Sequence, residues 1–193
     1  MARIILVLGG ARSGKSEFAE ELCLLSGKKV GYIATSKIYD EEMAQRVELH
    51  RKRRPNSWKV WETPSGEEEI LSIAREESEI ILFDCLTLYL TYWMFQLEMP
   101  KKEEDKERFL GGKVENMLKG FKEWDGTVIF VSNEVGYGVV PENSLAREFR
   151  DMSGKINSWI AQAADETYLV TCGYGIPIKK LAISPEEVIF SWK

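Results

Sequence analysis

Hydrophobic residues along the chain form short apolar runs that alternate with helical patterns. Runs such as Ile80–Phe83 do not alternate in polarity, which is typical of strands buried on both faces. The pattern predicts an α/β fold, with a mostly parallel central sheet, helices on both of its faces and an antiparallel hairpin at the C-terminal end. The expected strands are Ile4–Leu8, Lys29–Ala34, Trp58–Trp61, Ile80–Phe83, Val128–Val131 and Thr167–Thr171, with the last hairpin from Ile176 to Ile183.

The clearest helical pattern begins near Asn143. An apolar helix is also predicted over Leu86–Leu97, and the charged segment Pro100–Arg108 that follows it is interpreted as a solvated connection or the start of a helix. In the helix from Asn143, apolar residues recur at helical spacing and form one stripe. They are Leu145, Phe149, Met152, Ile156, Trp159 and Ile160.

Length and composition limit the class of protein. A chain of 193 residues suits one compact domain, residues 1–193, and 44% hydrophobic with 30% charged residues is ordinary for a globular protein. The net charge of −5 gives no basic field for nucleic acid or an anionic membrane. No apolar run approaches the roughly 20 residues that span a bilayer, and Ile4–Leu8 is interpreted as a strand, not a signal peptide.

The cysteines indicate the compartment. Cys23, Cys85 and Cys172 are widely spaced and odd in number, so they predict reduced thiols, with neither a disulfide framework nor metal-binding spacing. We therefore expect a soluble cytoplasmic protein with no nucleic-acid partner and no membrane span.

One motif carries specific chemistry. Glycines let backbone N–H groups turn toward phosphate oxygens, and the helix that follows points its positive end at the same anion. We expect Lys15 to reach the outer phosphates of a nucleoside triphosphate and the Ser16 hydroxyl to bind Mg²⁺. An apolar strand before the motif and a helical pattern after it argue against an incidental turn. The motif fits G-x-x-x-x-G-K-[ST] and consists of Gly9, Gly10, Ala11, Arg12, Ser13, Gly14, Lys15 and Ser16.

A second carboxylate is expected at the end of a neighbouring buried strand, where it would order the metal shell. Asp84 follows Ile80–Phe83 directly and takes that position. The alternative is an aspartate that caps the helix beginning near Leu86. The two roles are compatible.

His50 is the only histidine in the chain. It lies in a predicted helix that begins at Asp40 as N-cap and ends before Pro55. An inward stripe of this helix changes from apolar to histidine and arginine toward its end, and further arginines surround His50, which suits phosphates. The stripe is Met43, Val47, His50 and Arg54, and the other cations are Arg46, Arg51 and Arg53.

The chemistry available to His50 is nucleophilic. A neutral imidazole nitrogen could attack the α-phosphate of a nucleotide, forming a phosphoramidate and releasing pyrophosphate. Nearby cations would disfavour the imidazolium and keep the ring neutral. A surface histidine in a basic helix is the alternative that the chemistry alone leaves open.

Together the motifs resemble one enzyme family, adenosylcobinamide kinase / adenosylcobinamide-phosphate guanylyltransferase. The resemblance covers nearly the whole chain in order and departs mainly in Tyr92–Gly112, where the family varies. The residues that carry it are Gly9–Ser16, Ile33–Thr35, Arg46–His50 with Arg54-Pro55, Asp84–Leu88, Val131–Gly136, Val140–Asn143 with Arg147, Phe149–Asp151 and Gly154, Ala163–Glu166 and Gly173–Gly175.

The resemblance implies a bifunctional enzyme of cobalamin biosynthesis with a RecA-like P-loop fold that assembles as a homotrimer. It would phosphorylate adenosylcobinamide with ATP or GTP and transfer GMP from GTP to adenosylcobinamide phosphate, with Mg²⁺ as cofactor. It implies that His50 is the guanylylated histidine. Lys15, which the phosphate-loop motif itself predicts to reach the outer phosphates, is the other expected catalytic residue. The nucleotide contacts that the resemblance implies, beyond Gly9–Ser16, are Ile33, Ala34, Thr35, Arg51, Lys52, Arg53, Arg54, Glu62 and Asp84.

Two other classes of function compete with this hypothesis. A simpler small-molecule kinase would use the same loop and leave His50 structural. A GTP-dependent switch typically carries the guanine-reading tetrapeptide Asn-Lys-x-Asp, which this chain lacks.

Two glycine-containing loops are less specific indicators of function. The segment Gly136–Gly138 would either cover the corrinoid or turn the chain after a strand. Gly173 and Gly175 are expected to shape a turn before the last hairpin.

Overall fold

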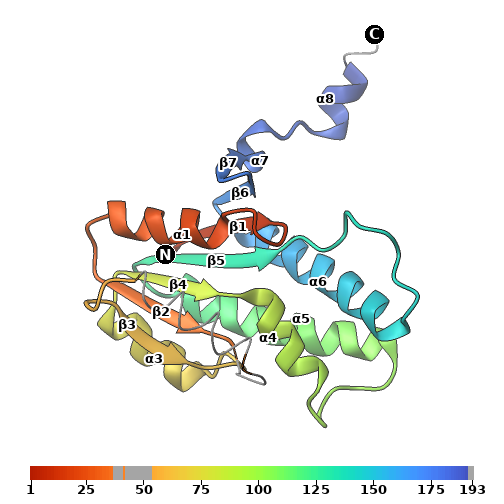
Figure 1. Ribbon diagram of the computed structural model, residues 1–193, viewed down its shortest axis with the longest axis horizontal. Helices are drawn as coiled ribbons and strands as arrows, with labels where there is room; N and C mark the ends of the chain where they lie inside the picture. The colour runs from red at the N-terminus through yellow and green to blue at the C-terminus, as the bar shows by residue number, and fades with distance from the viewer. Residues whose placement is uncertain (37–40, 42–53, 191–193) are drawn as a thin grey trace.

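A computed structural model of the protein describes residues 1–36, 41 and 54–190. Its centre is a seven-stranded sheet in the order β3-β2-β4-β5-β1-β6-β7 (Figure 1). Every neighbouring pair is parallel except β6 with β7, which is antiparallel. The strands are β1 (Arg3–Gly9), β2 (Val30–Ala34), β3 (Lys59–Glu62), β4 (Ile80–Asp84), β5 (Thr127–Asn133), β6 (Glu166–Thr171) and β7 (Tyr174–Pro177).

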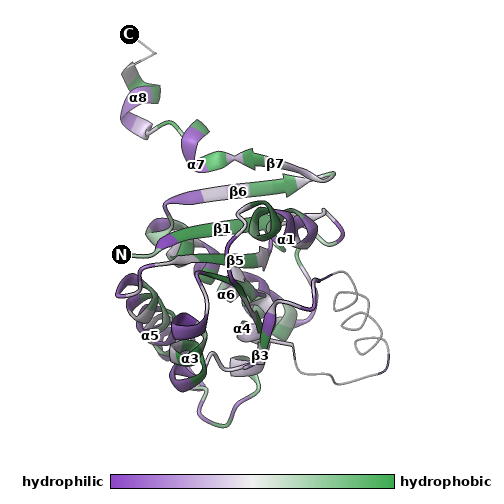
Figure 2. Ribbon diagram, turned by 90° about the vertical axis from the view of Figure 1, so that its left-hand side faces the viewer, coloured by the Kyte–Doolittle hydropathy of each residue, from purple (hydrophilic) through white to green (hydrophobic). Residues whose placement is uncertain are grey.

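Helices cover both faces of the sheet. On one face α1 packs on β1, β4, β5 and β6, and on the other α3, α4, α5 and α6 share a core with the sheet (Figures 1 and 2). The predicted α/β class with a terminal antiparallel hairpin is therefore confirmed. The helices are α1 (Lys15–Leu25), α3 (Glu68–Glu77), α4 (Leu86–Met94), α5 (Glu103–Lys122), α6 (Ser144–Ala163), α7 (Ile178–Leu181) and α8 (Pro185–Phe190).

Strand alternation divides the core between these two faces. In β1, Leu6 packs with the helices α3 to α6 and Val7 packs on the α1 side. Both side chains are fully buried, as expected for a central parallel strand. The order of strands places β5 between β1 and β4, so the strand before the phosphate loop and the strand ending at Asp84 are not direct neighbours.

The helix predicted from Asn143 is α6. The Asn143 side chain caps it by accepting a hydrogen bond from the backbone N–H of Ala146 (3.1 Å). The charged segment Pro100–Arg108 leads into α5, so its interpretation as a helix start is confirmed.

The last hairpin begins earlier than the sequence predicted. Thr171 pairs with Tyr174, so β6 and β7 form the hairpin, and residues 178–181 are helical, not part of a strand. The cause is a two-residue turn at Cys172 and Gly173, where φ is 51° and 82°. Two positive φ values characterise the tight turn that matches strand twist, so the chain reverses at once. Beyond β7, α8 extends away from the sheet (Figure 1).

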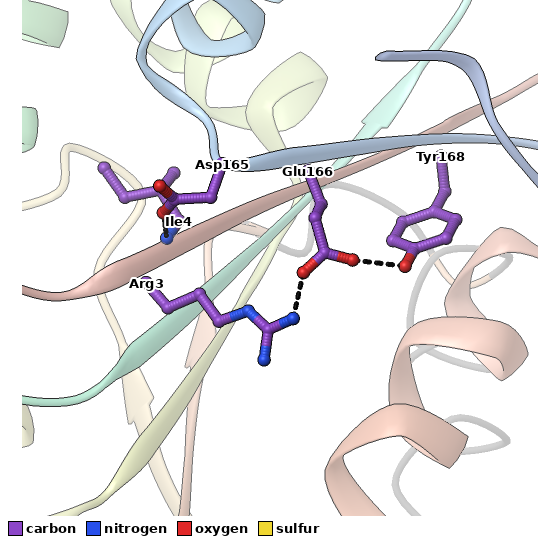
Figure 3. Close-up of polar contacts among 5 residues, drawn as sticks. All are labelled: Arg3, Ile4, Asp165, Glu166 and Tyr168. Atoms are coloured by element: carbon purple, nitrogen blue, oxygen red, sulfur yellow. Dashed lines mark hydrogen bonds and ion pairs between the residues drawn. The ribbon is translucent and has the colours of Figure 1, made fainter. Parts of the chain in front are cut away.

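Polar contacts fix the register of β1 and β6 where these strands begin (Figure 3). The backbone N–H of Ile4 donates to Asp165 Oδ2 (2.7 Å), and Glu166 accepts from both the Tyr168 hydroxyl and Arg3. The hydrogen bond from Tyr168, together with Arg3, lowers the pKa of Glu166. These contacts lie at the amino end of β1, opposite the loop that follows Gly9.

Within the described part of the chain, no helix combines the length and apolar character needed to cross a membrane.

Candidate functional site

The phosphate loop joins the carboxyl end of β1 to α1. β1 ends at Gly9 and α1 begins at Lys15. Between them the backbone takes a positive φ at Arg12 (56°) and at Gly14 (91°). Gly14 is the N-cap of α1 and has no side chain that could cap the first N–H groups of the helix. Such N–H groups are the usual ligands of a phosphate at a helix N-terminus.

The turn between β6 and β7 supports this loop. The backbone N–H of Gly173 donates to the Ser13 carbonyl oxygen (2.8 Å). A Cβ on Gly14 would lie 3.0 Å from Gly173 Cα, and one on Gly9 would lie 2.6 Å from the Val170 carbonyl oxygen. The loop therefore needs glycine at both positions. Gly173 belongs to the predicted turn, whereas Gly175 lies in β7 against the ring of Phe18.

Lys15 points back into the loop. Its ammonium donates to the Gly10 carbonyl oxygen (3.2 Å). Its positive charge also opposes the rise in the pKa of Cys85, which burial and then the charge of Asp84 bring to about 11. The cation of the loop therefore lies within electrostatic range of the end of β4, and the half-buried Ser16 follows it in α1.

The carboxyl ends of the parallel strands bring most of the other predicted residues to the same edge of the sheet. Ala34 is in register with both Glu62 and Asp84, and Gly9 is in register with Asn133. Glu62 is exposed and Ala34 is half-buried. A ligand extending from the loop across this edge would meet both of them.

Two of the predicted nucleotide contacts have buried side chains. Ile33 is in the core, and the Thr35 hydroxyl both donates to the Cys85 carbonyl oxygen (2.8 Å) and accepts from the Cys85 N–H (2.7 Å). A nucleotide would therefore meet the backbone of this segment or the side chain of Ala34. The Thr35 side chain instead joins the ends of β2 and β4.

Asp84 ends β4, and the first turn of α4, which the structure describes in full, has Cys85 as N-cap and no side-chain cap. The capping role considered for Asp84 is therefore wrong. Its Oδ2 instead accepts a hydrogen bond from the Tyr32 hydroxyl (3.1 Å). Burial, and then the negative charge of Asp84, raise the pKa of Tyr32 well above its usual value, so the phenol remains a donor.

Arg54 lies next to this pair. Its guanidinium carbon is 3.4 Å from the centroid of the Tyr32 ring, and its Nε is 3.0 Å from Glu20 Oε1 on α1. The predicted nucleophile His50, together with Arg51, Lys52 and Arg53, lies outside the described residues.

Sequence reasoning gave no site role to Glu20 or Tyr32, and it named Asn133 only within Val131–Gly136, a segment that carries the family resemblance. Asn133 ends β5, between the phosphate loop and Asp84, and its amide donates to the Thr87 hydroxyl (3.1 Å). Its position at the carboxyl end of a buried strand was the available signal. Glu20 was recognisable as an acidic residue between Ala19 and Cys23, which both face the core.

The site also suits Mg²⁺. Among the described residues no group of three or more histidine, cysteine, aspartate or glutamate side chains could hold a metal ion alone. Mg²⁺ is usually bound through one or two protein oxygens, several waters and the phosphates of a nucleotide. The Ser16 hydroxyl, in the first turn of α1, and the Asp84 carboxylate, at the end of β4, are oxygens of this kind.

A glycine-rich loop between a central strand and a helix N-terminus, with a lysine in the loop and a carboxylate at a nearby strand end, defines a P-loop nucleotide-binding protein. The model of the family described as "Cobinamide kinase / cobinamide phosphate guanyltransferase" matches residues 5–178. The chain belongs to this family.

The chain is also similar in sequence to two curated proteins over most of their length. The chain is 39% identical over 181 residues to the bifunctional adenosylcobalamin biosynthesis protein CobU of Escherichia coli, covering 91% of this chain and 99% of that protein. It is 40% identical over 174 residues to the bifunctional adenosylcobalamin biosynthesis protein CobP of Pseudomonas aeruginosa, covering 90% and 96%.

Among solved structures, the flagellar accessory protein FlaH from Methanocaldococcus jannaschii is similar with a TM-score of 0.48 and 14% identity, covering 86% of this chain and 70% of that one. A KaiC-like protein from Pyrococcus horikoshii gives the same TM-score at 13% identity, with the same coverage.

Proposed function

We propose that the protein phosphorylates adenosylcobinamide with ATP or GTP and then transfers GMP from GTP to adenosylcobinamide phosphate. The products of the second reaction are adenosylcobinamide-GDP and pyrophosphate. Family membership supports both reactions. The observation that carries the proposal is the phosphate loop Gly9–Ser16, which is formed between β1 and α1 with Lys15 directed into it.

In the kinase step, the loop N–H groups and the N-terminus of α1 would hold the phosphates of the nucleotide. The Lys15 ammonium would leave the Gly10 carbonyl oxygen and bind the transferring phosphoryl group, where charge builds up in the transition state. Ser16 and Asp84 would hold Mg²⁺, which neutralises charge on the phosphate oxygens when bound. The adenosylcobinamide hydroxyl attacks the terminal phosphorus and loses its proton to solvent, while the bond from that phosphorus to the oxygen of the leaving nucleoside diphosphate breaks.

In the transfer step, we infer that a His50 ring nitrogen attacks the α-phosphorus of GTP. A phosphorus–nitrogen bond forms and the bond to the β-phosphate oxygen breaks, which releases pyrophosphate. The phosphate of adenosylcobinamide phosphate then attacks the same phosphorus and frees the imidazole. The position of Arg54 over the Tyr32 ring, whose hydroxyl donates to Asp84, supports this assignment because Arg54 follows His50 by only four residues in the sequence.

The remaining predicted nucleotide contacts are part of the same proposal. Ala34 and the backbone of Ile33 and Thr35 would border the nucleotide, and the exposed Glu62 carboxylate would accept hydrogen bonds from the base. Arg51, Lys52 and Arg53 are proposed to contact the phosphates together with Arg54.

We further propose that residues 1–193 act as a single domain, that the protein is cytoplasmic and that it assembles as a homotrimer. One sheet running through the chain supports the first proposal. The three free cysteines, two of them buried, suit a reducing compartment. Exposed apolar residues beyond β7, among them Leu181 and Ile183, provide surface that an assembly would bury.

Product analysis tests the two reactions. Wild-type protein mixed with GTP, Mg²⁺ and adenosylcobinamide phosphate should yield adenosylcobinamide-GDP and pyrophosphate. The His50→Ala variant should lose this product while still phosphorylating adenosylcobinamide. Lys15→Ala should lose at least about 100-fold in the kinase step, because a preorganised charge on the transferring group is removed. Loss of both activities in folded His50→Ala protein would contradict the two-step scheme.

A further inference from the structure

A buried ion pair connects α1 with the residue that precedes Pro55. Arg54 Nε lies 3.0 Å from Glu20 Oε1, and the two side chains are only 10% and 9% exposed. The Arg54 guanidinium also stacks on the ring of Tyr32, 3.4 Å from its centroid. A buried ion pair is weak support for stability alone, because desolvation of two charges is costly. The geometric effect of the pair is to hold the Arg54 guanidinium over the Tyr32 ring.

Tyr32 connects this ion pair to the end of β4. The Tyr32 side chain is buried, with its ring beneath Arg54 and its hydroxyl 3.1 Å from Asp84 Oδ2. Glu20, Arg54, Tyr32 and Asp84 therefore form a chain of contacts from α1 to β4. We call these four residues the α1–β4 relay.

A carboxylate that binds a metal ion depends on a hydrogen-bond partner to fix its orientation. Hydrogen bonds from neighbouring groups fix the orientation of a metal ligand, and their loss typically costs about 10- to 100-fold in metal affinity or activity. Asp84 Oδ2 accepts from Tyr32, so the second carboxylate oxygen can serve a metal ion. The hydroxyl has little freedom to turn away, because the ring is held between the sheet and Arg54.

We propose that Tyr32 is a positioning residue for Asp84, and that Glu20 and Arg54 hold the Tyr32 ring for this task. The inference rests on the proposed function, in which Asp84 and Ser16 bind the Mg²⁺ of the nucleotide complex. It assigns Glu20 and Tyr32 a role in metal–nucleotide binding, although neither belongs to the phosphate loop.

The test removes one oxygen atom. Tyr32→Phe keeps the ring beneath Arg54 but deletes the hydroxyl that reaches Asp84. Tyr168→Phe is the matched control, because its hydroxyl also donates to a carboxylate, Glu166, at the amino end of the sheet (Figure 3). Binding of Mn²⁺ with a non-hydrolysable GTP analogue is measured by the electron paramagnetic resonance signal of free Mn²⁺. Thermal melting without nucleotide checks that each variant is folded.

We expect Tyr32→Phe to weaken Mn²⁺ binding in the nucleotide complex about 10-fold or more and to raise the Mg²⁺ concentration for half-maximal activity by a similar factor. Tyr168→Phe should leave both values within about twofold of wild type. Glu20→Gln should shift both in the same direction as Tyr32→Phe but less, since it removes the charge that holds Arg54. This variant also tests the proposal if Tyr32→Phe does not fold.

Two results would overturn the inference. One is folded Tyr32→Phe protein with wild-type Mn²⁺ binding, and the other is Asp84→Asn protein that binds Mn²⁺ and nucleotide as wild type does. Neither result depends on the identity of the corrinoid substrate. A wild-type protein that binds Mn²⁺ and nucleotide but forms no corrinoid product would instead refute the proposed function and leave the relay intact.

Discussion

Replacing Gly9 by alanine should disturb the phosphate loop, whereas the same replacement at Gly10 should be tolerated. A Cβ at Gly9 would lie 2.6 Å from the Val170 carbonyl oxygen and would also meet the side chain of Ser13. Real Cβ atoms essentially never approach another heavy atom within 3.0 Å, so either β6 or the loop must move. At Gly10, apart from the two neighbouring residues in the chain, no heavy atom lies within 4 Å of the Cβ that alanine would add.

The size of the effect follows from the cost of overpacking. Inserting a methyl group into a closely packed position costs about 1–3 kcal/mol. For a protein of this size, each kcal/mol lowers Tm by about 2–4 °C, so Gly9→Ala should melt about 2–12 °C below wild type. Gly10→Ala should stay within about 0.5 kcal/mol of wild type, as surface substitutions generally do.

Differential scanning calorimetry without nucleotide measures the stability, and titration calorimetry with a non-hydrolysable GTP analogue measures the affinity. Gly9→Ala should bind the analogue more weakly, because movement of the loop displaces the N–H groups that hold phosphate. The reasoning is refuted if Gly9→Ala melts and binds like Gly10→Ala.

Three further predictions concern other parts of the molecule. At pH 8 a thiol reagent should modify the exposed Cys172 rapidly, while Cys85, whose pKa burial raises to about 11, should react only after denaturation; equal rates would contradict this. Asn143→Ala should cost about 0.5–2 kcal/mol in a urea melt by removing the cap of α6, and Asn143→Asp, which keeps an acceptor, should not. The hydrogen bond from Tyr168 lowers the pKa of Glu166, so its stabilisation is complete above the unfolded-state pKa and is lost as pH falls through the lower folded-state value. The Tm values of wild type and Glu166→Gln should therefore converge as the pH falls. A Tm difference that stays constant down to pH 2 would contradict this prediction.

Local sequence patterns were sufficient to predict much of the fold. Uniformly apolar runs predicted the central strands because both faces of the sheet are covered, and helical spacing predicted α6. The hairpin was misplaced because apolar spacing alone does not reveal where a chain reverses. A positive φ at Cys172, a residue with a Cβ, gives no recognisable sequence signal before Gly173.

The candidate site likewise has a part that the sequence predicts and a part that depends on contacts between distant residues. The phosphate loop is contiguous in sequence, so its spacing alone identified Gly9–Ser16. The partners of Asp84 come from other elements, and the contact between Glu20 and Arg54 joins residues 34 positions apart. Neither Glu20 nor Tyr32 has a motif around it, because their roles depend on how α1 and β2 meet β4 in three dimensions.

Covalent labelling with GTP that carries a radioactive α-phosphate addresses the transfer chemistry most directly. The protein should retain an acid-labile, base-stable label, as a phosphoramidate does. His50→Ala should remain unlabelled while keeping its kinase activity, and unlabelled adenosylcobinamide phosphate should chase the label from wild type into product. A folded wild-type enzyme that converts adenosylcobinamide phosphate without ever retaining the label, or a His50→Ala variant labelled as strongly as wild type, would contradict the account.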